Sequence, residues 1–225
     1  MAEETKKETQ SEMVPIIATE GTMVCPGCKT TLDCPSGEPW IVCGKCKAEF
    51  CTEKGDDAEG AAEAKYELNW RVIHKFKYVE EKEGKGNPFP HLVFPSPFPE
   101  HLEYLGLTEE EVKGEIDDLN KILQKTELSK CCYFFICETQ ESADRTRSKQ
   151  MTFRCTVWNE RIVDRHLRVC SKEFDRKSHW KTLLVKNGDE YVLELMQAYY
   201  TQTKAEPPSV KDISTLPVAA PKASA

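Results

Sequence analysis

The chain has 225 residues, a formal net charge of −7, 39% hydrophobic residues and 31% charged residues. This acidic balance makes the chain as a whole a poor nucleic-acid binder. Its longest apolar run, residues 131–137, is far shorter than the roughly 20 residues that a membrane span needs. The first ten residues, MAEETKKETQ, lack the apolar core of a secretory signal. We therefore expect a folded protein without a transmembrane segment.

Eleven cysteines are present, an odd number, and six of them lie within residues 25–51. In a chain without a secretory signal, this usage indicates a reducing compartment rather than a disulfide framework. The sequence therefore predicts a cytoplasmic protein that carries a compact cysteine-rich segment.

Composition divides the chain into five parts. Residues 1–20 are acidic and lack periodicity, so we expect them to be disordered. The cysteine-rich segment covers residues 21–52, and the small and charged residues of 53–65 are typical of a linker. Residues 66–202 carry the periodic patterns of a folded domain. Residues 203–225 are rich in Pro, Ala, Ser and Lys, and are expected to form a disordered tail.

Two Cys-x-x-Cys pairs mark the first element, Cys25 with Cys28 and Cys43 with Cys46, and fourteen residues separate the pairs. Each pair lets two thiolates converge from a tight turn, so two pairs complete a tetrahedral four-thiolate zinc site. With all four positions filled by protein, one zinc ion would be structural and would supply much of the segment's folding energy. Two redox-active pairs are the alternative, but the strand–helix setting of such motifs is missing.

The residues between these pairs resemble the lesion-simulating-disease type zinc finger, with the same fourteen-residue gap. The matching positions are Lys29, Thr30, Leu32, Pro35, Gly37 and Ile41. The resemblance implies a small zinc ribbon with regulatory and protein-binding roles. Cys34 stands where that family usually has Tyr, and Glu38 where it has Ala. We interpret Cys34 and Cys51 as bystanders, since four ligands are already present; the alternatives are that they replace members of the set as alternative ligands or form a redox pair.

Residues 66–78 alternate between apolar and polar side chains, which predicts a long strand with one face on a core. His74 lies on the apolar face and is expected to be buried. Residues 88–99 then interleave five prolines with three phenylalanines, which predicts an extended segment. This segment is either a rigid crossing whose phenylalanines fill the core or a docking strip for an aromatic-lined groove.

A capping box, Thr108 with Glu111, begins the predicted helix 108–125. Apolar residues repeat along it at helical spacing, namely Val112, Ile116, Leu119 and Leu123. Residues 131–137 and 151–158 are interpreted as buried strands. Strands over 182–186 and 191–196 flank Asn187-Gly188, a strong hairpin signal. The fold class predicted is α+β: a zinc ribbon followed by a largely antiparallel domain, with disordered termini.

Residues 70–196 also resemble the golgin-A-seven family of accessory subunits of DHHC-type palmitoyltransferases. Three features match: an FP-x-x-L motif, a helix ending in Leu-Asn, and a downstream Asn before a terminal strand. In this sequence they are Phe98, Pro99 and Leu102; Leu119 and Asn120; and Asn159 with Leu193-Glu194. The family's long apolar, cysteine-bearing segment is shorter here, at residues 131–137. The resemblance implies a partner of a membrane acyltransferase, peripheral at the Golgi or endoplasmic reticulum membrane.

Charge is unevenly placed along the main domain. Residues 80–127 have a net charge of −7, whereas residues 144–181 hold eleven Lys or Arg against five acids, net +6. Arg161, Arg165 and Arg168 recur at three- and four-residue spacing and are candidate contact residues, with Trp158 nearby. Their partner would be an anionic membrane, nucleic acid or an acidic protein. The alternative is that the basic segment pairs with the chain's own acidic helix.

No P-loop, Gly-x-Ser-x-Gly or His-Glu-x-x-His motif is present, so we expect no enzymatic activity. The sequence therefore predicts a zinc-binding adaptor that acts through protein partners, accessory to a membrane palmitoyltransferase if the second resemblance holds. The alternative is a nuclear zinc-finger regulator associated with nucleic acid or transcription.

Overall fold

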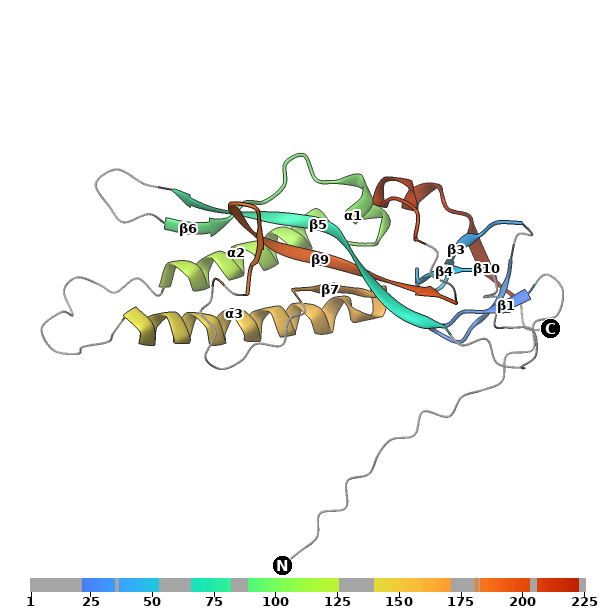
Figure 1. The fold of residues 1–225 in the computed structure, drawn as a ribbon, viewed down its shortest axis with the longest axis horizontal. Coiled ribbons are helices and arrows are strands. Elements are labelled where there is room, and N and C mark those ends of the chain that lie inside the picture. The colour runs from blue at the N-terminus through green and yellow to red at the C-terminus, as the bar shows by residue number, and fades with distance from the viewer. Residues whose placement is uncertain are drawn as a thin grey trace, which may run out of the picture.

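The computed structural model describes residues 22–34, 37–52, 66–81, 89–125, 140–170, 181, 183–202 and 206–222. The predicted disorder of residues 1–20, the linker 53–65 and the apolar run 131–137 lie outside the described residues. The fold class predicted from the sequence, α+β and largely antiparallel, is confirmed (Figure 1).

The described strands form one ten-stranded sheet. They are β1 (Thr22–Val24), β2 (Thr31–Asp33), β3 (Trp40–Cys43), β4 (Glu49–Cys51), β5 (Glu67–Glu81), β6 (Phe89–Leu92), β7 (Leu167–Val169), β8 (Val185–Asn187), β9 (Glu190–Thr201) and β10 (Val218–Pro221). The order is β1-β2-β10-β3-β4-β9-β5-β6, and β7 and β8 also pair with β9. Pairing is antiparallel except between β10 and β3 and between β4 and β9. The cysteine-rich segment and the main domain therefore share one sheet.

Strand β9 organises this sheet. Along one edge it pairs with β5 for most of its length, with a register shift in β5 between Val72 and His74. Its other pairings are short and follow one another along the strand: β8 at residues 190–192, β7 at 195–197 and β4 at 199–200. The predicted hairpin is present as the β8–β9 pair, but its turn is Gly188-Asp189 rather than Asn187-Gly188, because Asn187 lies in β8 and pairs with Glu190. This succession brings β7 of the main domain beside β4 of the cysteine-rich segment.

The helices are α1 (Glu100–Tyr104), α2 (Glu109–Lys125) and α3 (Gln140–Ile162), with 3-10 turns η3 (Val163–Arg165) and η5 (Val210–Thr215). Figure 1 shows α2 and α3 side by side below β5 and β9, and α1 next to η5. The predicted helix 108–125 is confirmed as α2, and Thr108 Oγ1 accepts a 3.2 Å hydrogen bond from the Glu111 backbone N–H. The four predicted apolar residues of α2 are all buried.

The strand predicted over 151–158 is wrong, because these residues lie inside helix α3. Their β-branched and aromatic side chains favour a strand locally. However, the buried residues recur at helical spacing: Met151, Cys155, Trp158 and Ile162. This stripe packs on the sheet, so tertiary burial determines the helix.

The tail predicted over 203–225 also differs from the structure. Of its described residues, 206–222, six form η5 and four form β10. Strand β10 lies between β2 and β3, where Val42 N–H donates to the Pro217 carbonyl (3.0 Å) and Gly44 N–H to the Ala219 carbonyl (2.9 Å). Ala219 is buried. Backbone hydrogen bonds and the small buried side chain of Ala219 hold this segment in the sheet. Because backbone hydrogen bonds do not depend on residue type, the composition of the segment does not reveal that it is ordered.

Arg71 on β5 joins three parts of the fold. Its guanidinium pairs with Glu49 on β4 and donates to Gln197 Oε1 on β9 (3.0 Å) and to the Pro208 carbonyl (2.7 Å). Glu49 is fully buried, and burial raises the pKa of its carboxyl while Arg71 opposes that shift. The buried charge therefore depends on contact between the cysteine-rich segment and the main domain.

Two asparagines fasten the helices to neighbouring backbone. Asn120 on α2 accepts from Leu92 N–H (2.7 Å) and donates to the Leu92 carbonyl (3.0 Å). Asn159 on α3 does the same with Val169, at 2.6 and 3.1 Å. Each side chain thus satisfies both backbone groups of one strand residue. These are the two asparagines of the golgin-A-seven pattern.

The proline-rich segment crosses the surface, and the phenylalanines whose side chains the structure describes face inward. Phe94 and Phe98 are stacked, with ring centroids 6.1 Å apart, and both pack against the main core. This arrangement fits the rigid crossing, one of the two alternatives that the sequence left open.

Candidate metal centre

The two Cys-x-x-Cys pairs form matching turns at the ends of short strands. Lys29 N–H donates to the Cys25 carbonyl and Lys47 N–H to the Cys43 carbonyl, both at 2.9 Å. Lys29 and Lys47 both have left-handed backbones, with φ values of 60° and 61°. The chain reverses in the same way after each pair, so each turn aims two sulfur atoms at the other turn.

The four sulfur atoms of Cys25, Cys28, Cys43 and Cys46 lie within 4.8 Å of one another. Across the two turns, Cys25 Sγ is 3.6 Å from Cys46 Sγ, and Cys28 Sγ is 3.7 Å from Cys43 Sγ. Four sulfurs placed tetrahedrally about 2.3 Å from a zinc ion are separated by about 3.8 Å. The predicted residues therefore come together, and their spacing fits a tetrahedral metal ion.

Hydrogen bonds and burial shift the pKa values of these thiols in opposite directions: those of Cys25 and Cys43 are raised and that of Cys46 is lowered. The Cys46 pKa is lowered, chiefly because Cys25 donates a hydrogen bond to its sulfur, and the Cys25 pKa is raised for the same reason. Backbone N–H groups also point at the sulfurs: that of Cys28 at Cys25, and that of Ala48 at Cys46. Such donors stabilise thiolates, the form that binds metal.

A small core of its own surrounds the centre. Cys25 and Cys43 are fully buried, whereas Cys28 and Cys46 are partly exposed. The buried apolar residues packed around them are Leu32, Ile41, Ala48, Phe50 and Ala219. Tyr66, which immediately precedes β5, and Tyr200 on β9 pack against the same cluster. The metal centre is therefore enclosed partly by the main domain.

Cys34 and Cys51 lie near the centre but outside the group of four sulfurs. Cys51 is buried on β4, and Cys34 is partly buried, with its pKa raised by burial. Within the residues that the structure describes, the candidate metal group thus consists of the four cysteines predicted from their spacing.

His166 belongs to this site, although sequence reasoning missed it. It immediately precedes β7, and hydrogen bonding to His166 is among the causes that lower the Cys46 pKa. A Cβ placed on Gly27 would lie 2.8 Å from His166 Cε1 and 2.9 Å from Nε2. The imidazole therefore fills the space beside the first turn. No local pattern connects His166 with cysteines so far away in the sequence.

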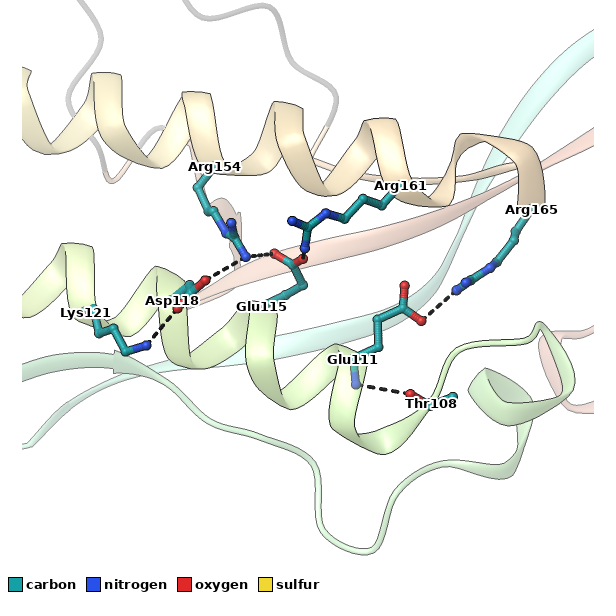
Figure 2. Close-up of polar contacts among 8 residues, drawn as sticks. All are labelled: Thr108, Glu111, Glu115, Asp118, Lys121, Arg154, Arg161 and Arg165. Atoms are coloured by element: carbon teal, nitrogen blue, oxygen red, sulfur yellow. Dashed lines mark hydrogen bonds and ion pairs between the residues drawn. The ribbon is translucent and has the colours of Figure 1, made fainter.

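The candidate contact arginines are placed differently from the sequence interpretation. Figure 2 shows Arg161 and Arg165 pointing from the end of α3 and from η3 toward α2. Arg161 Nη1 lies 2.7 Å from Glu115 Oε1, and Arg165 Nη1 lies 2.8 Å from Glu111 Oε2. Both arginines thus pair with the chain's own acidic helix, the alternative that the sequence left open.

Arg168 and Trp158 do not join these arginines in one contact surface. The Arg168 guanidinium stacks over the Trp70 ring, 3.8 Å from its centroid, and Trp158 is fully buried in the main core. The Arg168 guanidinium and the Trp158 ring are thus occupied by contacts within the fold. Residues 171–180 of the basic segment lie outside the described part of the chain.

None of the described helices is both long and apolar enough to cross a bilayer. Comparisons with protein-family models, curated proteins and solved structures find no match to this chain.

Proposed function

We propose that this protein is a non-enzymatic zinc-binding adaptor that acts through contacts with protein partners. The observation that carries the proposal is the group of four cysteine sulfurs, which lie within 4.8 Å of one another. An all-thiolate tetrahedral site suits zinc, and it leaves no coordination position for a substrate or a reactive water. The ion's role is therefore to hold the ribbon together.

Metal analysis of the purified full chain tests the zinc site. We expect about one zinc per chain and loss of that zinc in Cys43→Ser. Cys51→Ser is the matched control, because Cys51 is equally buried but lies outside the group of four. Full zinc occupancy in Cys43→Ser would refute the four-ligand assignment.

The resemblance to the golgin-A-seven family leads us to propose a membrane palmitoyltransferase of the DHHC type as the partner. The placement that goes with it is peripheral, at the Golgi or endoplasmic reticulum membrane. Two residues that carry the resemblance, Asn120 and Asn159, fasten α2 and α3 to the backbone of neighbouring strands. The proposal of this partner rests on the sequence resemblance.

Co-expression with a DHHC-type acyltransferase tests the partner. We expect the chain to co-purify with the enzyme in detergent and to increase the enzyme's yield of acylated form. Asn159→Ala is the test variant and Asn69→Ala the control, because Asn69 makes only an exposed contact with the Glu67 carbonyl. Absence of co-purification with any such enzyme would remove the palmitoyltransferase link and leave the zinc site untouched.

The nucleic-acid alternative has less support. Arg161 and Arg165 form ion pairs with α2, Arg168 stacks on Trp70, and Trp158 is buried. Direct titration of a mixed-sequence DNA duplex at low salt checks this alternative. Tight, salt-dependent binding would favour the regulator over the adaptor.

A further inference from the structure

We propose that His166 is a positioning residue of the metal centre, an outer-sphere hydrogen-bond donor that the main domain supplies to Cys46. The inference rests on the proposed zinc binding and adds a residue to that same site. It also assigns a physical connection between the metal ion and strand β9, on which the main domain is built.

The imidazole lies against both cysteine turns. It occupies the space beside Gly27 of the first turn so closely that a Cβ there would meet Cε1 at 2.8 Å. Hydrogen bonding to His166 is also among the causes that lower the pKa of Cys46, in the second turn. The candidate metal group contains the four sulfurs and does not include His166, so the ring lies outside the first coordination shell.

The main domain fixes the ring in this place. His166 has a left-handed backbone, with φ 55° and ψ 34°. Its N–H donates to the Val163 carbonyl (2.9 Å), and its own carbonyl accepts from Ala198 N–H on β9 (2.8 Å). The ring meets Tyr200 edge to face, with centroids 5.9 Å apart. Backbone and ring are thus both tied to β9.

The topology explains why this residue reaches the metal centre. Strands β7 and β4 follow one another along β9, with Leu167 opposite Gln197 and Glu49 opposite Tyr199. The residue before β7 therefore lies where β4 begins, beside the second cysteine turn. Because both contacts depend on β9, a shift of this strand would move the imidazole relative to the sulfur.

The chemistry favours a donor at this position. Four thiolates around one Zn²⁺ leave a formal charge of −2, and an N–H group directed at a thiolate stabilises that excess charge. Outer-sphere partners of metal ligands typically contribute about 10–100-fold to metal affinity. The side chains of the buried apolar residues around the centre carry no such donor.

The first test measures zinc affinity of the full chain by competition with a chromophoric chelator at fixed pH. His166→Phe keeps a ring but removes the donor, and we expect about 10–100-fold weaker zinc binding. His166→Gln keeps an N–H donor and should recover part of that loss. Wild-type affinity in His166→Phe, or equal losses in the Phe and Gln variants, would overturn the inference.

The second test uses Gly27→Ala, whose methyl group would meet the imidazole. Alone, it should displace the ring and weaken zinc binding. In the His166→Ala background only the contact with Ala48 Cβ, at 3.2 Å, remains, so the added loss should be smaller. Strictly additive effects would show that the ring does not pack on the first turn, and would overturn the inference. A wild-type chain that binds no zinc would instead refute the proposed function itself, so the two failures are distinguishable.

Discussion

The carboxylate of Glu115 and the guanidinium of Arg154 form a 2.7 Å ion pair at a place where the Glu115 side chain is only 2% exposed. The same arginine atom lies 2.7 Å from Asp118, and Arg161 lies 2.7 Å from the second oxygen of Glu115 (Figure 2). Three basic residues of one segment, Arg154, Arg161 and Arg165, thus form ion pairs with acidic residues of α2. The electrostatic asymmetry of the sequence contributes to holding the fold together.

Arg154 and Arg161 both pair with Glu115 but differ in exposure, so removing each should lower the free energy of unfolding by a different amount. Arg154 is 20% exposed and Arg161 is 57% exposed. Removing one partner of a fully buried pair costs roughly 3–5 kcal/mol, so Arg154→Met should approach the lower end of that range. Arg161→Met should cost less than about 1 kcal/mol. Urea denaturation of both variants checks the order, and equal losses would contradict it.

Leu119 on α2 is fully buried in the main core. Leu119→Ala should therefore lower the free energy of unfolding by about 2–5 kcal/mol, through lost apolar contact and the cavity left behind. Ile122, three residues farther along α2, is only partly buried. Ile122→Ala is therefore the comparison variant. A thermal midpoint of Leu119→Ala equal to wild type would mean that this face of α2 is not a core face.

His74 makes the fold sensitive to acid. Its ring lies 5.7 Å from that of His101, and burial, followed by repulsion from His101, lowers the His74 pKa from 6.5 to about 4. Between these values the unfolded chain binds more protons than the folded chain, so stability falls as the pH drops from 6.5 toward 4.

His74→Phe should reduce this acid dependence. The measurement is the urea midpoint at pH 7 and at pH 5 for wild type and variant. Because both proteins keep the same four cysteines, zinc release in acid affects both, and the difference between them isolates the imidazole. Identical pH dependence in the two proteins would argue against a buried neutral histidine.

Ala219 of β10 is buried in the core of the metal centre, and its carbonyl accepts from Gly44 in the second cysteine turn. Ala219→Glu would place a carboxylate beside the thiolates, so we expect loss of β10 from the sheet and weaker zinc binding. Ala220→Glu is the control, since Ala220 is exposed on the same strand. Chelator competition compares the two, and equal zinc affinities would contradict the packing of β10 on the centre.

The sequence predicts well where local patterns and burial agree. The cysteine spacing and the cap and apolar stripe of α2 contain the full signal within a few residues. The alternation of β5 and the Asn-Gly pair predict a strand and a hairpin, but Leu68 is exposed, Ile73 is buried, and the turn is displaced by one residue. The interpretation of 151–158 failed because strand-favouring residues there also satisfy a helical period, and only packing on the sheet decides between them. Arg161 and Arg165 were ambiguous for a related reason, since charge alone does not identify the partner.

Contacts between distant segments had no signal of this kind. His166, the Arg71–Glu49 pair and strand β10 all join parts of the chain that composition assigns to separate units. Each depends on the order of strands along β9 or on the position between β2 and β3. A short stretch of sequence does not predict the order of strands along β9 or the position between β2 and β3, because the order of strands in a sheet depends on how all of them pack together.

The position of β10 also orders events during synthesis. The ribbon's other strands, β1 to β4, leave the ribosome early, yet β2 and β3 are joined through a strand that is translated after the entire main domain. The cysteine turns can therefore capture an ion long before their sheet closes. Completion of the ribbon must wait until residues 218–221 emerge, so a segment made before the main domain reaches its final form after it.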